Sequence, residues 1–280
     1  MTTERSSSSN AERAARALLI VGRAGSQGLS LGDVAQALGE GKPGTHRTLT
    51  ALSRYGFIEK QGHGRYRLGP AIFALAQLDG AVHDRLTHWR PLLAKTALRH
   101  GCTVYLLERA GFDMVVLDMN VGSAPLQALT SGIGDRLPLG LGPAAAAILI
   151  TLDAPMRELI LTHNAAGFVA RGYGETHVRR FVAETLARGY ALDRGKFVPE
   201  CGGIALPIRN RNGQASAAIS VSAPASFLTD QRVAEIVTEL QAAIEIIAFA
   251  PQQRQTTKDE TPNIPQSHKK SRARTETTVR

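Results

Sequence analysis

The chain has little cysteine, with only Cys102 and Cys201 among its 280 residues. The two are far apart and form no Cys-x-x-Cys pair, and the eight histidines are scattered without a His-Glu-x-x-His motif. This pattern argues against a disulfide framework and against a zinc finger. We therefore expect no structural metal and no cofactor.

The chain also lacks a long apolar run. A membrane helix requires about 20 apolar residues, and no uninterrupted apolar segment approaches that length. The longest candidate, Ala144 to Ile150, suits a short buried helix. The first ten residues, MTTERSSSSN, are polar and lack the apolar core of a signal peptide. We expect a soluble, cytoplasmic protein with no membrane partner.

Acidic residues are outnumbered, because 24 Asp and Glu stand against 33 Lys and Arg, for a formal net charge of +9. This excess favours an acidic partner, but charge alone does not separate nucleic acid from an anionic membrane surface. The length predicts two domains, and the hydrophobic content of 43% supports a well-buried core.

Residues 30–69 follow the order of a winged helix-turn-helix. Ser30 and Asp33 form a capping box at the start of one helix, which Gly39 ends. A second helix begins at Pro43 and ends near Tyr55. A short hairpin follows, with strands at 57–60 and 65–68 around a turn at 61–64. In such a unit the second helix fits the major groove of DNA.

This stretch is also strongly basic. Residues 41–69 contain one acidic residue, Glu59, and six basic residues: Lys42, Arg47, Arg54, Lys60, Arg65 and Arg67. So much positive charge in a short region suits a phosphate backbone. Arg54 and Lys60 have an alternative as solvated surface charges.

The remainder of the chain has the pattern of an α+β domain. Residues 70–100 predict two helical pieces broken near Pro91, forming a connector. Beyond them, strands are expected at 103–109, 114–119, 190–193, 201–209 and 214–221, and helices at 143–152, 154–163, 175–188 and 230–249. This order predicts a largely antiparallel sheet. Residues 1–10 and the basic tail 251–280 have the composition of disordered segments.

Several ordered motifs make residues 11–250 resemble the IclR family of bacterial transcriptional regulators. They are AERAARALLIV, LSLGDVAQALG, KPGTHRTLTALSRYGFIEK, GRYRLGP, GDRLPL, RGYALDRGKF and IALPI with AAISVSAPASFLT. The resemblance implies a two-domain α+β chain with a winged helix-turn-helix at 11–70, a helical linker at 71–100 and a GAF-like effector-binding domain at 101–250. It also implies a homodimer or a dimer of dimers on operator DNA.

The resemblance places the DNA contacts at eight residues: Ser30, Lys42, Thr45, His46, Arg47, Thr48, Arg65 and Arg67. Thr45, Arg47 and Thr48 would reach base edges, where Arg47 suits a guanine. Ser30 and Lys42 would contact phosphates, and Arg65 and Arg67 would contact phosphate or the minor groove through the wing. His46 has an alternative as an ordinary surface residue, and Tyr66 is expected in the core under the wing.

The family's effector site falls on ten residues: Leu126, Leu129, Gly142, Pro143, Ala144, Asp193, Cys201, Gly203, Ser220 and Ser222. The helix start at 142–144 would offer free N–H groups to a carboxylate. Each residue has an alternative as plain core or as a turn cap.

This chain departs from the family pattern at three places in that site. Gly140-Leu141-Gly142 replaces the usual histidine-containing motif, Pro143 has no N–H, and Gly203 stands where many members have cysteine. We expect fewer donors and more space, suited to a larger or more apolar ligand.

The predicted function is a DNA-binding regulator, not an enzyme, and by family habit a repressor. It would respond to a small organic-acid or aromatic effector and control an adjacent catabolic operon. Two alternatives stay open, an enzyme with an appended DNA-binding domain and an architectural DNA-binding protein without a ligand. The enzyme alternative lacks a recognisable catalytic motif such as Gly-x-Ser-x-Gly.

Overall fold

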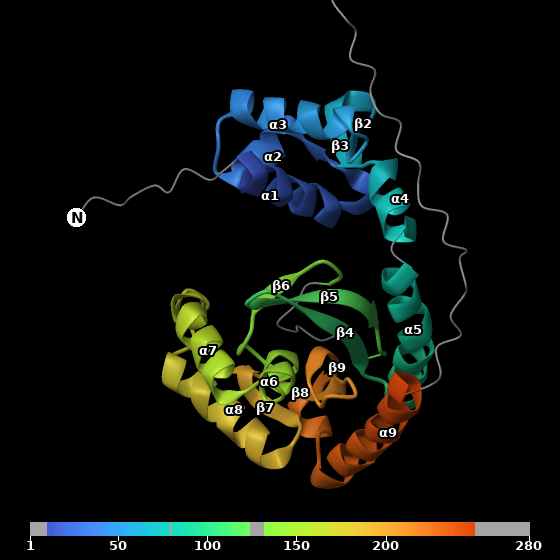
Figure 1. Ribbon diagram of the computed structural model, residues 1–280, viewed down its shortest axis with the longest axis vertical. Coiled ribbons are helices and arrows are strands. Elements are labelled where there is room, and N and C mark those ends of the chain that lie inside the picture. The colour runs from blue at the N-terminus through green and yellow to red at the C-terminus, as the bar shows by residue number, and fades with distance from the viewer. Residues whose placement is uncertain (1–9, 79, 124–131, 250–280) are drawn as a thin grey trace, which may run out of the picture. The chain divides into compact units, whose positions relative to one another are not determined.

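The N-terminal part of the chain is a winged helix-turn-helix (Figure 1). The structure is a computed structural model and describes residues 10–78, 80–123 and 132–249. Three helices and a small antiparallel sheet of order β1-β3-β2 make up this part: α1 (Asn10–Arg23), β1 (Leu29–Ser30), α2 (Leu31–Leu38), α3 (Lys42–Arg54), β2 (Ile58–Lys60) and β3 (Arg65–Leu68). The predicted order is confirmed, and the two-residue β1 was not predicted.

Local sequence signals set the ends of these helices. The Ser30 hydroxyl accepts the Asp33 N–H at 3.2 Å, and the Asp33 carboxylate accepts the Ser30 N–H at 3.0 Å, so the predicted capping box is present. Gly39 ends α2 with a left-handed φ of 72°. A core beneath the wing includes Tyr66, which is 5% exposed, as expected.

Two helices follow the wing, α4 (Pro70–Leu78) and α5 (Gly80–His100). The predicted break near Pro91 is wrong, because α5 continues through this proline. A proline inside a helix removes one backbone hydrogen bond, and its ring crowds the preceding turn. Pro91 is exposed, so the freed carbonyl group lies on the side of α5 that faces water.

The C-terminal part is built on a six-stranded sheet of order β6-β5-β4-β9-β8-β7, in which every pair is antiparallel. Its strands are β4 (Thr103–Ala110), β5 (Asp113–Asn120), β6 (Arg136–Pro138), β7 (Ala191–Val198), β8 (Cys201–Arg209) and β9 (Ala215–Pro224). The predicted antiparallel sheet is confirmed. The short β6 was missed, because three residues carry no periodic signal.

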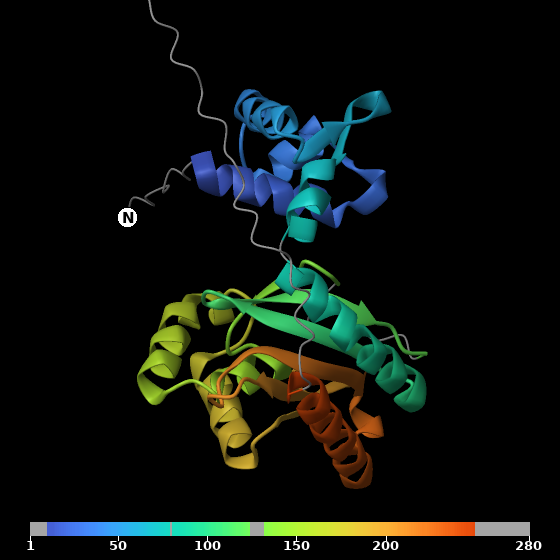
Figure 2. The ribbon, with the colours of Figure 1, turned by 45° about the vertical axis from the view of Figure 1, so that its right-hand side comes forward.

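Helices cover both faces of this sheet (Figure 2). One face carries α6 (Pro143–Leu149), α7 (Ala154–Val169) and α8 (Glu175–Arg188), and the other carries α5 and α9 (Asp230–Phe249). Alternate residues of β4 serve the two sides: Tyr105 and Leu107 join the α6 side, and Val104 and Leu106 join the α9 side. Among the described helices none combines the length and the apolar character needed to cross a membrane.

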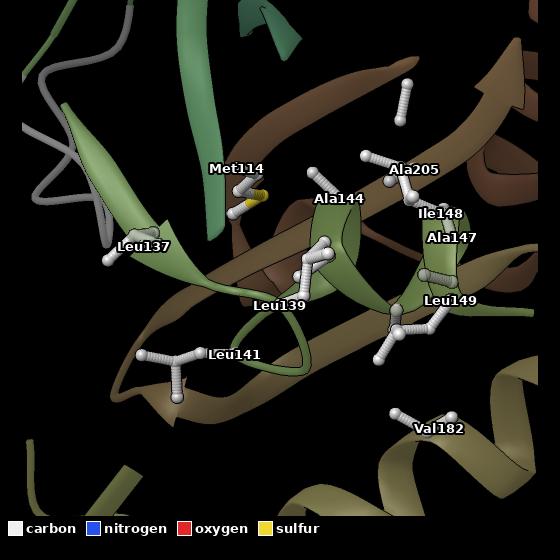
Figure 3. Close-up of a cluster of buried hydrophobic side chains, with 14 of the residues drawn as sticks. Met114, Leu137, Leu139, Leu141, Ala144, Ala147, Ile148, Leu149, Val182 and Ala205 are labelled. Atoms are coloured by element: carbon white, nitrogen blue, oxygen red, sulfur yellow. The ribbon is translucent and has the colours of Figure 1, made fainter. Parts of the chain in front are cut away.

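Helix α6 lies at the centre of the hydrophobic cluster that it forms with α7, α8 and one face of the sheet. Six of its residues, from Ala144 to Leu149, are buried. Figure 3 shows Ala144, Ala147, Ile148 and Leu149 of this helix among side chains from the sheet and from α8. Alanine side chains let α6 approach the strands closely, so a helix of small residues suits this position.

Asn164 connects α7 to the turn between β4 and β5 and to the loop that precedes α6. It is 7% exposed, and its amide group donates hydrogen bonds to the carbonyl oxygens of Phe112 at 2.7 Å and Leu139 at 3.0 Å. The same loop contains Gly140, where a Cβ atom would lie 2.7 Å from the Phe168 ring. The hydrogen bonds of Asn164 and the close packing at Gly140 together set the path of the chain into α6.

We expect Asn164→Ala to lower the free energy of unfolding by about 2 kcal/mol, because a buried carbonyl group loses its donor. Urea unfolding followed by the fluorescence of Trp89, the single tryptophan, which packs on the sheet, would measure this change. Leu159→Ala, at a position on the same helix that is 53% exposed, is the control and should change little. Equal effects of the two substitutions would contradict this role of Asn164.

Candidate functional site

One face of α3 is packed into the core and the opposite face is exposed. Thr45, Leu49 and Leu52 are buried on the inner face. Thr45 is 0% exposed, and its hydroxyl donates to the Gly41 carbonyl oxygen at 3.2 Å. Our expectation that Thr45 reaches a base edge is therefore wrong, because its side chain points into the protein.

The exposed face of α3 carries the positive charge. Arg47, Thr50 and Arg54 are exposed and lie three and seven positions apart, which puts them along one line of the helix. From the sequence, Arg54 was either a DNA contact or a solvated charge. Its spacing of seven residues from Arg47 was the available signal, because it puts the two side chains on the same side of the helix. We call these three residues the outer face of α3.

The other predicted residues of this helix are placed differently. Lys42 and His46 are exposed in its first turns. Thr48 is half-buried, and its hydroxyl donates to the Gly44 carbonyl oxygen at 3.3 Å. The first two therefore have side chains free to meet a partner, whereas the hydroxyl hydrogen of Thr48 is already in use.

The predicted wing residues already have protein partners. Arg65 donates from Nε to the Gln27 carbonyl oxygen at 2.8 Å and from Nη2 to that of Gly28 at 3.0 Å. Arg67 pairs with Glu59 on the neighbouring strand. These bonds hold the hairpin and orient both guanidinium groups. Ser30 is occupied as an acceptor in the α2 cap, which leaves its hydroxyl hydrogen free.

In the C-terminal part, eight of the predicted effector residues lie around one cavity between α6 and the sheet. They are Gly142, Pro143, Ala144, Asp193, Cys201, Gly203, Ser220 and Ser222. The cavity offers about 60 Å³ to the centre of a water molecule, which is room for a few ordered waters or a small organic molecule. Leu126 and Leu129 lie outside the described residues.

Sequence reasoning missed the apolar part of this lining. It comes from β4, β5, β6 and β7 and from the loop before α6: Tyr105, Leu107, Met114, Leu137, Leu141, Phe197 and Val198. The alternation of the strand at 103–109 was the available signal, because it puts Tyr105 and Leu107 on one face. Figure 3 shows Met114, Leu137 and Leu141 around the start of α6, near Ala144.

The strand register explains why the polar residues meet. Asp193 on β7 pairs with Gly203 on β8, and Gly203 pairs with Ser222 on β9, so the three stand in one row across the sheet. Ser220 lies two residues from Ser222 and therefore on the same face. Cys201 Sγ lies 3.4 Å from the Ser222 Oγ, and both are buried.

Pro143 and Gly203, two of the residues that depart from the family pattern, lie next to each other. A Cβ atom built on Gly203 would lie 3.0 Å from Cγ of Pro143 and 3.2 Å from the Val221 carbonyl oxygen. The proline ring therefore fills the room that a side chain at 203 would take. The glycine at 203 therefore accommodates the proline ring.

Asp193 is the acidic residue among the described residues that line the cavity. It is 3% exposed, and one carboxylate oxygen accepts the Lys196 N–H at 2.8 Å. Burial raises the pKa of Asp193, and hydrogen bonds from the N–H groups of Lys196, Phe197 and Arg194 act in the opposite direction. Within the described residues, no group of three or more His, Cys, Asp or Glu side chains is placed to hold a metal ion.

Comparisons with known proteins agree with both parts of this structure. Residues 11–62 match the model of the IclR helix-turn-helix domain, and residues 82–248 match that of the bacterial transcriptional regulator IclR C-terminal domain. The chain is 27% identical over 224 residues to the transcriptional repressor IclR of Escherichia coli, covering 78% of this chain and 81% of that protein. It is 28% identical over 246 residues to the glycerol operon regulatory protein of Streptomyces griseus, covering 85% and 93%.

A solved structure shows the same fold. The structure of an IclR homologue from Microbacterium hydrocarbonoxydans, complexed with 4-hydroxybenzoate, superposes with a TM-score of 0.69 at 22% identity, covering 87% of this chain and all of that one. The two matching domain models together span most of the chain, in the order that the structure shows. The chain belongs to the IclR family of bacterial transcriptional regulators.

Proposed function

We propose that this chain represses transcription by binding operator DNA through α3 and the wing, and that a small effector in the cavity changes this binding. The observation that carries the proposal is the exposed, cationic outer face of α3 in a chain that also holds a lined cavity. We retain the predicted division into a DNA-binding domain at 11–70, a linker at 71–100 and an effector domain at 101–250. An adjacent catabolic operon is the proposed target.

In this proposal the outer face of α3 enters the major groove. Arg47 binds a guanine edge with its two guanidinium donors, and Arg54 extends the contact about two turns further along the helix. Lys42, His46 and the Ser30 hydroxyl contact phosphates, and Arg65 and Arg67 do so from the wing. Thr48 contributes its methyl group, because its hydroxyl hydrogen is bonded to Gly44.

The effector would act by a population shift. A ligand that binds one arrangement of the domains more tightly than another changes the fraction of molecules able to bind DNA. A neighbour in structure was solved with 4-hydroxybenzoate, which supports effector binding in such a domain. The predicted organic-acid or aromatic class agrees with that ligand.

The proposed homodimer or dimer of dimers has a candidate surface on α4. The sequence of this helix, PAIFALAQL, is almost wholly apolar, yet none of its residues is buried. Phe73 is 69% exposed, Leu75 is 52% exposed and Leu78 is 82% exposed. Exposed apolar surface of this kind marks an interaction site. The proposed partner at this surface is a second copy of the chain, because a dimer with two recognition helices can bind two operator half-sites.

We expect Arg47→Ala to weaken operator binding by about 10- to 100-fold, since a bidentate contact with guanine contributes about 1–3 kcal/mol. Fluorescence anisotropy with a duplex from the region upstream of the chain's own gene would measure it. Arg211→Ala removes the same charge at an exposed position beyond β8 and should leave the affinity unchanged. Unchanged affinity in Arg47→Ala would contradict the proposed interface.

We expect Ser220→Leu, which fills the cavity, to retain operator binding and to abolish its response to effectors. The probes are 4-hydroxybenzoate, propionate and lactate with the corresponding amides, added to the same anisotropy assay. Ser216→Leu, at an exposed position of the same strand, should respond as the unaltered chain does. A response that persists in Ser220→Leu would place the effector elsewhere, and no response to any probe in the unaltered chain would count against the effector role.

We expect Leu78→Glu to shift the chain toward smaller assemblies, because a charge would be buried in the proposed α4 interface. Sedimentation velocity over a range of concentrations would show the change. Gln77→Glu adds the same charge at the neighbouring exposed position of the helix and is the control. An unchanged sedimentation coefficient in Leu78→Glu would exclude α4 from the interface.

A further inference from the structure

We propose that the groove between the β8–β9 hairpin and the C-terminal part of α9 binds a free amino acid with an apolar side chain. This site is separate from the cavity beside α6, because it lies on the other face of the sheet. Its volume is about 330 Å³, against about 60 Å³ for the cavity. Small-molecule sites have volumes from about 300 Å³ upward, so the groove has room for such a ligand.

The floor of the groove is apolar. Leu206 of β8 and Ile244 of α9 are buried there, and both belong to the hydrophobic cluster on the α9 side of the sheet. Ala248 and Phe249 extend this surface toward the end of α9, where Phe249 is 49% exposed. An apolar side chain placed against these residues would be removed from water, which is favourable. The floor therefore accounts for the apolar part of the ligand.

The hairpin supplies a positive rim. Arg209 and Arg211 line the groove and are exposed. The turn of the hairpin is held in shape, because Arg209 Nη1 donates to the Gly213 carbonyl oxygen at 2.8 Å. Asn210 Oδ1 also accepts the Gln214 N–H at 3.1 Å. A guanidinium group at the tip of a fixed turn is suited to binding the carboxylate of a ligand.

Helix α9 supplies the opposite charge. Glu245 lines the groove, is exposed and follows the buried Ile244. Within the part of the chain that the structure describes, neither Glu245 nor Arg211 has an ion-pair partner, and the two do not pair with each other. Two unpaired charges of opposite sign on one groove suit a dipolar ligand, whose carboxylate faces Arg211 and whose ammonium group faces Glu245. A free amino acid carries both charges at neutral pH.

The test compares leucine with three relatives that each lack one part, using the full chain. Leucinamide lacks the carboxylate, N-acetylleucine lacks the ammonium group, and glycine lacks the apolar side chain. An NMR titration gives each Kd, and shifts of the methyl signals of Leu206 and Ile244 locate the ligand. Because exposed ion pairs contribute little, we expect leucinamide and N-acetylleucine to bind about three- to fivefold more weakly than leucine. Glycine should leave both methyl signals unshifted.

Two variants assign the charges to their partners. Arg211→Gln should remove most of the preference for leucine over leucinamide and retain the preference over N-acetylleucine. Glu245→Gln should have the reverse effect. Both positions are exposed, so the core is undisturbed. Glu235→Gln removes the same charge from an exposed position of α9 away from the groove, and it should change neither preference.

A further variant separates this site from the cavity beside α6. Ser220→Leu fills that cavity and does not touch the groove, so it should leave the Kd of leucine as it is. Loss of leucine binding in this variant would place the amino acid in the cavity and overturn the inference. The effector role proposed for the cavity is tested by its own probes, so the two proposals can fail independently.

Three other outcomes would also overturn the inference. Leucine that binds without shifting the signals of Leu206 and Ile244 lies elsewhere on the chain. Preferences that stay the same in Arg211→Gln and in Glu245→Gln exclude recognition by these charges. An unaltered chain that shows no shift of any signal with leucine has no such site.

Discussion

The alternation of side chains along the central strands is the constraint on which the C-terminal part depends. Each strand of β4, β9 and β8 sends every second residue to α6 and the others to α5 and α9. A shift of one residue in any pairing would exchange the two sets, so the packing of both layers fixes the register. The same register sets Asp193, Gly203 and Ser222 side by side. The cavity is thus a product of the core that surrounds it.

The packing of the Pro143 ring against Gly203 shapes one wall of the cavity. A larger residue at 203 would meet the proline ring, and a residue with an N–H at 143 would offer an anion a donor. The two positions therefore have to be understood together. Their joint effect is a small space with hydroxyl groups, a thiol and one buried carboxylate.

Much of this was predictable from sequence. The capping box, the glycine at 39 and the strand alternation are local signals, so the helices, the wing and the antiparallel sheet followed from them. The burial of Thr45 depends on the rotation of α3 about its axis, which the sequence fixes only loosely. The uninterrupted α5 shows that an exposed proline need not end a helix that is held by packing. The contact of Pro143 with Gly203 joins distant segments and has no local signal.

The central claim is that ligand in the cavity and operator on α3 are linked. Linkage requires that a ligand which changes the operator Kd by some factor has its own Kd changed by the same factor when operator is bound. Among 4-hydroxybenzoate, propionate, lactate and the corresponding amides, the probe that changes operator binding most is titrated into the chain alone and into the chain saturated with operator, which measures both sides of this relation. We predict that this probe has unequal affinities for the two forms, with a ratio equal to the shift in operator Kd. Equal affinities for the two forms would contradict it.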